Sequence, residues 1–473
     1  MISLFGTLDM AANSLSVQQE EMTITGQNLA NVNNTAYADE QLDVSESAPV
    51  ETAAGDEGTG IQVNAITESR NPLLDSQIQA ETSTTGSLTA QQTNLQNAEA
   101  YLDEQITSTS SSDVPDSPNG LAAGLSNLFN SFQSLSTNTG DNPNGLSLRQ
   151  AAVQSAQDVA AQFNQVSTQL STVQSNLNTD VKNDVASSNQ DLNTIATLNE
   201  QIVAAEAGGG TADQLVDQRE QTLENLAGLA NFSTTAEANG AINVSIGGVT
   251  MVSGGVAADQ LETYDPGNGQ LQVQAQNAGT QITLTGGSIA GEITARDGAL
   301  ASLQSGLNTL ASQLITQVNS IYSPGYDLNG DTGQDLFTGT GAANMGVNSN
   351  VVNDPSQFQA AGVPGAAGDN KVVLALAALG NQQLAGLNNQ TISSNYAQTV
   401  SDLGNAISSV TDKLNTSQAV SQMLSNDRAA TSGVSLDGEM TNLIQYQKAY
   451  EASAEMITTL NEMLQTVVAM KTT

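Results

Sequence analysis

One long segment without helix-breaking residues constrains the fold of this chain more than any other feature. From Leu146 to Ala207 the sequence contains neither Gly nor Pro, and apolar residues recur at alternating steps of three and four. This spacing is the heptad pattern of a helix with one apolar stripe. As a single helix the segment would span about 90 Å at ~1.5 Å per residue, which favours an elongated bundle over a compact globule. The pattern drifts near Asp180, so a break at that point stays open. The stripe residues are Ala152, Ala156, Val159, Phe163, Val166, Leu170, Val173, Leu177, Leu192, Ile195 and Ile202.

Heptad patterns also occur at the two chain ends. The first covers an N-terminal helix that stops before the turn-forming Asn-rich residues 31–34. The last covers a helix predicted over 436–470, which has two adjacent apolar stripes and therefore needs more than one packing partner. We expect the two ends to pair as a coiled coil and to make the assembly contacts of the chain. The residues assigned to these contacts are Leu4, Leu8, Ala11, Leu15, Met22, Leu29, Leu443, Tyr450, Ile457, Leu460, Leu464 and Val468.

The middle of the chain has a different character. Within 232–288, short alternating runs such as Ile242-Val244-Ile246 lie between Asn-Gly and Gly-Gly pairs, which predicts a small β-rich insertion. Helix resumes at about 298–322, and the Ser-, Pro- and Asp-rich residues 108–120 predict a linker.

The predicted fold class is mainly α, an elongated long-helix bundle with a terminal coiled coil formed by both chain ends, plus a small β-rich insertion. The predicted division is a terminal coiled-coil assembly domain (1–70 and 430–473), a helical bundle (71–231, 289–323 and 391–429), the β-rich insertion (232–288) and a loop-rich outer insertion (324–390).

The composition excludes several classes of function. The chain has no Cys, His or Trp, so it cannot form a disulfide, a Cys- or His-ligated zinc site or a His-dependent catalytic triad. We expect no catalytic residue, cofactor or metal, and a protein that is not an enzyme. Carboxylate-pair hydrolysis is the enzymatic alternative, but an aromatic content of 3% argues against a sugar-binding cleft. The net charge of −38 disfavours contact with nucleic acid or an anionic membrane.

The N-terminal sequence bears on export. The first basic residue is Arg70, and the first 30 residues contain no unbroken apolar run, so no cleaved secretory signal is predicted. No segment approaches the roughly 20 apolar residues of a membrane span. We therefore expect a chain that is cytoplasmic or exported by a route that does not read such a signal.

Two charged patterns are better explained by structure than by chemistry. Asp327, Asn329 and Asp331 alternate as in a calcium loop, but the Gly precedes the third acidic position and the twelfth position is not Glu, so a satisfied turn is predicted. Arg219 and Arg296 are each flanked by carboxylates, and each is predicted to form an inter-helix ion pair that fixes helix register.

The two chain ends resemble the flagellar axial proteins, the family of rod, hook and hook-associated subunits. Residues 28–37 (NLANVNNTAY) resemble the family's N-terminal signature, with Ala36 in place of the usual Gly, and residues 432–464 are similar to its C-terminal signature. By this resemblance Asn31 and Tyr37 join the expected assembly contacts.

Three internal segments resemble the hook-associated protein 1 family in particular. They are residues 198–229, which include the run Asp217-Gln218-Arg219-Glu220, residues 286–300 and residues 325–337. The order and spacing of the matches extend over nearly the whole chain.

The resemblance implies a structural adaptor that self-assembles through its terminal helices and joins the flagellar hook to the filament. The implied partners are further copies of the chain in a ring-like or helical homo-oligomer, the hook protein, the next hook-associated protein toward the filament, and a cytoplasmic export chaperone. The implied location is extracellular, at the hook–filament junction, after type III export without a cleaved signal peptide. A hook or rod subunit is the alternative, against which the Asp-Gln-Arg-Glu segment and the long central helix argue.

Overall fold

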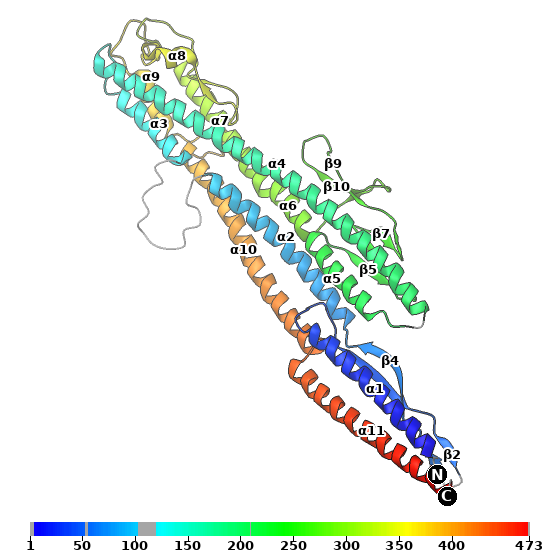
Figure 1. Ribbon diagram of the computed structural model, residues 1–473. Helices are drawn as coiled ribbons and strands as arrows, with labels where there is room; N and C mark the ends of the chain where they lie inside the picture. The colour runs from blue at the N-terminus through cyan, green and yellow to red at the C-terminus, as the bar shows by residue number, and fades with distance from the viewer. Residues whose placement is uncertain (1–3, 53–54, 103–119, 209, 472–473) are drawn as a thin grey trace.

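The computed structural model describes residues 4–52, 55–102, 120–208 and 210–471, and in it long helices form an elongated rod. The N and C termini lie together at one end of the rod, and the short helices α8 and α9 lie at the other (Figure 1). The mainly α fold class is therefore confirmed. The predicted linker at 108–120 falls, apart from Gly120, outside the described residues.

The helix α4 (Pro143–Ala207) is continuous, so the drift of its apolar pattern near Asp180 marks no break. Asn142 caps its start by accepting a hydrogen bond from the backbone N–H of Gly145 at 3.0 Å. From Ala152 to Leu177 its stripe residues belong to one buried apolar cluster, and from Val181 to Ile195 they belong to a second. The pattern drifts because the helix changes packing partners at this point.

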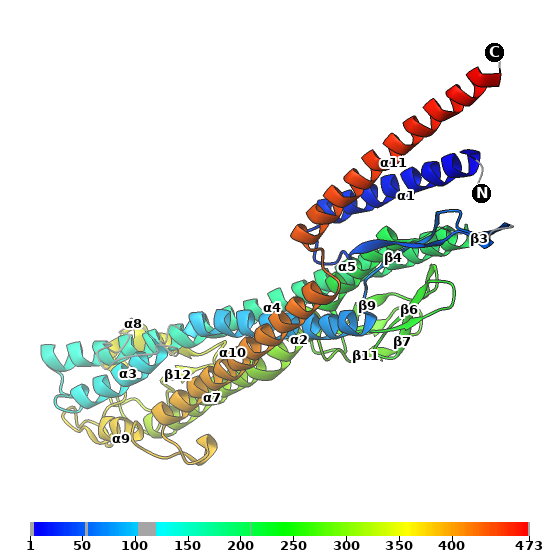
Figure 2. The same cartoon turned by 90° about the horizontal axis from the view of Figure 1, so that it is seen from below.

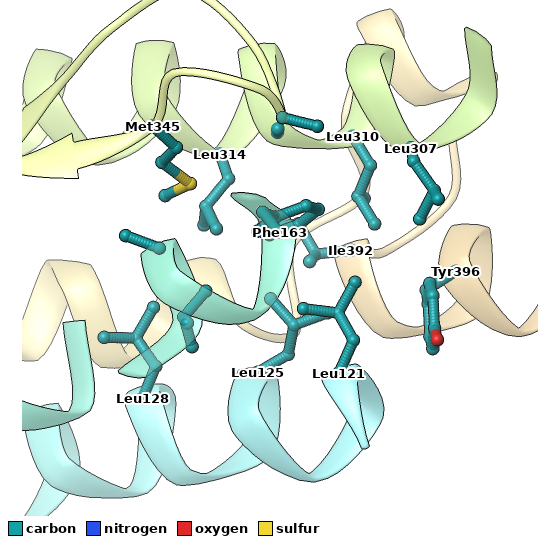
Figure 3. Close-up of a cluster of buried hydrophobic side chains, with 14 of the residues drawn as sticks. Leu121, Leu125, Leu128, Phe163, Leu307, Leu310, Leu314, Met345, Ile392 and Tyr396 are labelled. Atoms are coloured by element: carbon teal, nitrogen blue, oxygen red, sulfur yellow. The ribbon is translucent and has the colours of Figure 1, made fainter. Parts of the chain in front are cut away.

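The first cluster is the core of the distal half of the bundle. There α4 packs with α3 (Leu121–Leu135), α7 (Ala301–Tyr322) and the ends of α2 (Pro72–Leu102) and α10 (Ile392–Thr431). Phe163 of α4, which is 1% exposed, lies between leucines of α3 and leucines of α7 (Figure 3). A buried aromatic side chain at such a position contributes about 3–5 kcal/mol relative to Ala.

The helix predicted from about residue 298 begins earlier. The helix α6 (Gly287–Ala295) passes through a π-helical turn (Arg296–Leu300) directly into α7. A Cβ at Gly287 would lie 2.2 Å from the backbone carbonyl of Leu229, and one at Gly291 would lie 2.2 Å from a backbone oxygen of α2. These glycines resemble turn signals in the sequence, but they permit the close approach of α6 to its neighbouring helices.

The predicted β-rich insertion is present. Its strands form a four-stranded antiparallel sheet in the order β5-β6-β7-β8 and a three-stranded one in the order β11-β10-β9. Inward side chains such as Val244 and Met251, each fully buried, form the second core cluster with α4 and α5 (Asp213–Leu229). The strands are β5 (Ser233–Ala236), β6 (Ile242–Ile246), β7 (Val249–Ser253), β8 (Val256–Ala257), β9 (Leu261–Tyr264), β10 (Gln272–Ala275) and β11 (Gln281–Ile282).

A row of Asn side chains on α4 attaches this insertion to the helix. Asn178 donates to the carbonyl of Gly269, and Asn189 donates to and accepts from the backbone of Leu261 at 2.8 Å each way. Asn199, fully buried, donates to the carbonyls of Ile242 and Gly254. An amide side chain presents one acceptor and two donors, so one Asn can satisfy a backbone N–H and a backbone carbonyl at the same time.

Residues 324–390 contribute to the bundle core rather than forming loops alone. The helix α9 (Lys371–Leu379), which was not predicted, places Val373 and Leu376 in the first cluster, where Phe358 also lies. Its nine residues are almost all apolar and show no helical period, which is why the pattern gave no helix signal. The other elements are β12 (Phe337–Thr338), β13 (Gly346–Val347), α8 (Ser349–Asn353) and 3-10 turns at Pro355–Gln357 and Ala385–Leu387.

The Asp327 loop is a hydrogen-bonded turn. The Oδ1 atom of Asp327 accepts from the backbone N–H groups of Asn329 and Asp331, each at 2.8 Å. Within the described part of the chain, no group of three or more Asp or Glu residues is arranged to hold a metal ion.

The predicted inter-helix ion pair of Arg219 is wrong, because its described partners are neutral. Arg219 donates to the side-chain oxygen of Asn199 at 3.1 Å and to the carbonyl of Gly240 at 2.8 Å. Asp217 points instead toward Arg70. Residues two apart on a helix face different directions, so the sequence neighbours of Arg219 were poor candidates for its partner. The predicted inter-helix ion pair of Arg296 is wrong as well: Arg296 pairs with Asp297, its neighbour on the same helical segment, and its contact with α4 is a hydrogen bond to Asn178 at 2.7 Å.

The Asn row generates a first prediction. Asn199→Ala removes its two donors and its acceptor, so the buried backbone of Ile242 loses both bonds to Asn199, and Arg219 keeps its bond to the carbonyl of Gly240 but loses the one to Asn199. We expect a loss of unfolding free energy of about 1–3 kcal/mol. Chemical denaturation followed by circular dichroism measures this loss of unfolding free energy.

The exposed Asn193 on the same helix is the matched control, and Asn193→Ala should change stability by less than about 0.5 kcal/mol. Equal stability of the two variants would contradict the prediction.

Candidate assembly site at the paired chain ends

The two chain ends form a separate terminal module. In it α1 (Leu4–Ala30) and α11 (Leu436–Lys471) lie side by side and antiparallel, beside a hairpin of β1 (Glu40–Glu46) and β4 (Ile61–Glu68) that β2 (Val50–Thr52) and β3 (Gly55–Glu57) extend. The module is set at an angle to the bundle (Figure 2). The pairing of α1 with α11 is the arrangement that the terminal heptads predicted.

The predicted assembly residues differ in exposure. Ala11, Tyr37 and Leu460 are buried, whereas Tyr450 and Val468 are exposed, at 37% and 62%. The remaining ones are half-buried: Leu4, Leu8, Leu15, Met22, Leu29, Asn31, Leu443, Ile457 and Leu464. Most of them lie on α1 and α11, which pack against each other. Whether they also contact other subunits stays a prediction.

A second apolar stripe on α11 faces away from α1. Met456, Met463 and Met470 follow one another at seven-residue intervals and are 49%, 50% and 75% exposed. Methionine side chains are flexible and polarizable, so they suit contacts with more than one partner. This exposed apolar row is therefore the candidate contact surface of the module.

A polar cluster joins the helices of the module where they meet the bundle. Asn28 accepts from the hydroxyl of Tyr37 at 2.7 Å and donates to Asp39, to the carbonyl of Glu40 and to Glu439 of α11. Asn28, which is 1% exposed, and Glu439 were not among the predicted site residues. The signal was present, since Asn28 opens the signature run, but a polar residue beside an apolar seam was not assigned a role.

The turn after α1 forms without strain. The backbone N–H of Tyr37 donates to the carbonyl of Asn34, and that of Ala36 donates to the Asn34 side chain. Among the described non-glycine residues a positive φ occurs at Asn388 and Asn389, so Ala36 does not adopt the left-handed conformation. The substitution of Ala for the usual Gly is therefore compatible with the turn.

The module meets the bundle at a charged joint centred on Arg70. This arginine pairs with Glu68 at 3.0 Å, with Asp75 of α2 at 3.3 Å and with Asp217 of α5, and it donates to the carbonyl of Ala36 at 3.0 Å. Glu220, one turn after Asp217, accepts from Gln79 of α2 at 3.0 Å. The Asp-Gln-Arg-Glu run is thus divided, since its two acids face the joint and its arginine faces the β-rich insertion.

Burial changes the acidity of this joint. Desolvation raises the pKa of Asp217 to about 7; Arg70 acts against the rise, and Glu68 adds to it. Desolvation likewise raises the pKa of Glu220 to about 7, with a further contribution from Asp75. Desolvation also raises the pKa of Glu68 above its ordinary value. The carboxylates around Arg70 therefore exceed the charge that one guanidinium can balance.

The comparisons with known proteins agree with this architecture. A family model described as the flagellar hook-associated protein FlgK helical domain matches residues 111–337, and one described as the flagellar basal body rod FlgEFG protein C-terminal matches residues 418–470. Together they match more than half of the chain. The flagellar hook junction protein FlgK from Burkholderia pseudomallei has the same fold, with a TM-score of 0.63 at 18% identity over 75% of this chain and all of that one.

Curated relatives extend over the full length. Flagellar hook-associated protein 1 of Bacillus subtilis (strain 168) is 27% identical over 99% of this chain and 98% of its own. The proteins of that name from Salmonella typhimurium and Escherichia coli (strain K12) are 23% and 22% identical, each over 96% of this chain.

The fold, the paired ends and these matches define a structural protein of the flagellar axial class. Within that class, the chain belongs to the flagellar hook-associated protein 1 family. No described helix is long and apolar enough to cross a membrane.

The exposed stripe on α11 leads to a second prediction. In the monomer α11 has α1 as its main helical partner, and most of its apolar side chains are half-buried or exposed. Single helices depend on packing for stability. In native-state hydrogen exchange, we expect the amides of Leu443–Val468 to be at least roughly 100-fold less protected than those of Val166–Val181 in α4. Equal protection of both segments in a verified monomer would contradict this expectation.

Proposed function

We propose that this chain is the adaptor subunit that joins the flagellar hook to the filament, and that it assembles through its terminal module. The observation that carries the proposal is the exposed Met456–Met463–Met470 row on a helix whose other face already packs on α1. Full-length relatives named flagellar hook-associated protein 1 support the location. The adaptor works by contact alone and is not an enzyme.

The proposed subunit has two mechanical parts. The terminal module supplies the contacts between subunits, and its helices lie in the inner part of the tube that the assembled subunits form. The bundle supplies a rigid body that faces outward, because two apolar clusters share one continuous helix, α4. A flexible hook and a stiff filament differ in mechanical response, so a subunit between them must hold its shape under load while its ends match both neighbours.

The partners follow from this position. We propose contacts with further copies of this chain in a ring-like or helical homo-oligomer, with the hook protein on one side, and with the next hook-associated protein toward the filament on the other. Before export, a cytoplasmic chaperone would cover the stripe of α11, since a bare Met- and Leu-rich face invites aggregation. The chain would then leave by the flagellar type III route without cleavage, and it would reside outside the cell. The net charge of −38 supports the absence of nucleic acid and membrane partners.

A hook or rod subunit is the second candidate, because the C-terminal match is described for basal body rod proteins. The match of residues 111–337 to the hook-associated helical domain favours the junction. The two candidates place the protein at different points of the flagellum, so its position decides between them.

Labelling of isolated flagella therefore tests the location. We expect antibodies against the β-rich insertion to mark a short zone between hook and filament. The insertion is a suitable epitope because its two small sheets lie along one side of the bundle (Figure 1). Antibody along the hook or at the rod would support the second candidate and overturn the first.

A substitution in the module tests whether the seam between α1 and α11 is needed for assembly. Ile457→Asp with Leu464→Asp places two carboxylates at half-buried positions of α11. A charge that assembly buries without a partner costs about 3–5 kcal/mol. We expect a soluble monomer whose bundle melts as in the wild type, in cells that carry hooks but release unpolymerised flagellin. Electron microscopy of the cells and thermal melting of the purified chain measure both parts.

The matched control is Thr458→Asp with Gln465→Asp, which adds the same charge at neighbouring exposed positions of the same helix. These cells should form filaments. Normal filaments on the Ile457 and Leu464 variant would show that this seam is not needed for assembly.

A further inference from the structure

The β-rich insertion has one unprotected edge, at β5. This strand is the outer strand of the four-stranded sheet, and all of its residues, Ser233–Ala236, are exposed. A free strand edge can pair with a further strand, and proteins usually protect it with a charge, a proline, a bulge or a very short strand. The run Ser-Thr-Thr-Ala has no charge and no proline, and its register with β6 shows no shift. The opposite edge, β8, is only two residues long.

The hydrogen bonds near β5 show which of its backbone groups point outward. Glu237 donates to the carbonyl of Ala241, and bonded and non-bonded pairs alternate along an antiparallel ladder. Thr234 and Ala236 therefore direct their N–H and C=O groups away from β6. In the part of the chain that the structure describes, no hydrogen bond involves these outward groups. Each of the two residues thus presents one donor and one acceptor to an incoming strand.

A groove of about 480 Å³ lies beside this edge, between β5, the end of α5 and α2. Ser83 of α2 lines it, and its hydroxyl has no hydrogen-bond partner although the side chain is only 4% exposed. A buried polar group without a partner is costly, so this hydroxyl indicates that a polar group binds beside it. None of the lining residues is charged, although the chain carries a net charge of −38. The groove therefore suits a neutral extended segment, even one that belongs to an acidic protein.

The chain carries a second unprotected edge, on β4 of the terminal module (Figure 1). β4 pairs with β1 on one side only, and its residues Ile61–Thr67 are all uncharged. Outside this pairing, no described hydrogen bond involves their backbone. Val63, in the middle of the strand, is an apolar side chain that is 37% exposed. A second copy of the chain can therefore supply the strand that the edge at β5 lacks.

Symmetry distinguishes the possible pairings of these edges. A pairing of β5 with β5, or of β4 with β4, joins identical surfaces and closes a dimer. A pairing of β4 with β5 joins two different surfaces, so it repeats from copy to copy and forms a ring or a helix. The second kind of pairing agrees with the homo-oligomer of the proposed function.

We propose that β4 of one copy extends the four-stranded sheet of the next copy by pairing with the free edge of β5. The backbone of β4 bonds to Thr234 and Ala236, Val63 packs in the groove against Phe232, and a polar group of the incoming segment bonds to Ser83. The terminal module of each subunit is thereby tied to the insertion of its neighbour. This inference rests on the proposed assembly and names one contact within it.

Cross-linking in isolated flagella tests the pairing. The chain has no Cys, so Val63→Cys with Thr234→Cys places one thiol on each exposed edge. A short bis-maleimide reagent joins thiols on adjacent strands, and an antibody against the chain reveals the products on a denaturing gel. We expect a ladder of dimers, trimers and higher multimers, because each copy is linked to one neighbour through β4 and to another through β5.

Each single-Cys variant is a control and should give no multimers. Dimers from a single variant would show pairing of identical edges and would overturn the proposal. The matched double variant is Val256→Cys with Thr234→Cys, which moves the first thiol to the exposed edge β8 and should stay monomeric. A ladder from this variant, a product with a different protein, or no multimers from the Val63 and Thr234 variant would also overturn it. Antibody labelling tests the location separately, so failure of the contact and failure of the proposed function are distinguishable.

A proline on the edge gives a second measurement that needs no thiol. Thr234→Pro removes an N–H that points away from β6, so the bonds within the sheet stay and the monomer should melt as the wild type does. The incoming strand loses a hydrogen bond, and we expect roughly three- to tenfold more filaments to detach under shear.

The matched control is Ala257→Pro on β8. Its N–H also points outward, because the next residue, Ala258, donates to the carbonyl of Met251 within the sheet. This variant should retain its filaments as the wild type does. Equal retention of filaments by the Thr234 and Ala257 variants would contradict the proposal.

Discussion

The structure depends on one constraint, which is that a single uninterrupted helix supplies one wall of two separate cores. The stripe of α4 buries Phe163 and Leu170 among the helices of the distal half, and it buries Val181 and Ile195 against the β-rich insertion. Because a helix transmits its rise and rotation from one core to the other, neither core can shift along α4 without disturbing the register of the other. The bundle is therefore one rigid body, although its parts come from segments far apart in the sequence.

Amide side chains provide the specific attachments in this acidic chain. Charged residues make up 12% of the sequence and cations are few, so ion pairs are scarce. Asn178, Asn189 and Asn199 attach the insertion, and Asn319 of α7 satisfies the backbone at Leu336 and Phe337 in the same way. A neutral amide needs less desolvation than a charge and still fixes direction, which suits junctions between a helix and irregular backbone.

The periodic parts of the fold could be predicted from the sequence, and the parts made by tertiary contact could not. The helix α4, the pairing of the ends and the hairpins all follow from local spacing. The helix α9 lacks a period, and the glycines of α6 imitate a turn although they serve close packing. At the site, the heptad spacing predicted the half-buried residues of α1 and α11. It could not predict the ion pair of Arg70 with Asp217, 147 residues away, because nothing local indicates which acid a single cation will contact.

The contrast between bundle and module explains how one subunit can be both rigid and adaptable. The bundle is held by large apolar clusters, whose side chains contribute several kcal/mol each, so its shape survives changes of solvent and partner. The module is held by a helix pair with half-buried seams and by a polar joint of contacts worth about 1 kcal/mol each. Free energy of that size is comparable to what a neighbouring subunit gains by covering the exposed methionine row of α11. In the proposed assembly, packing against neighbours would therefore choose the orientation of the module, while the bundle keeps its form.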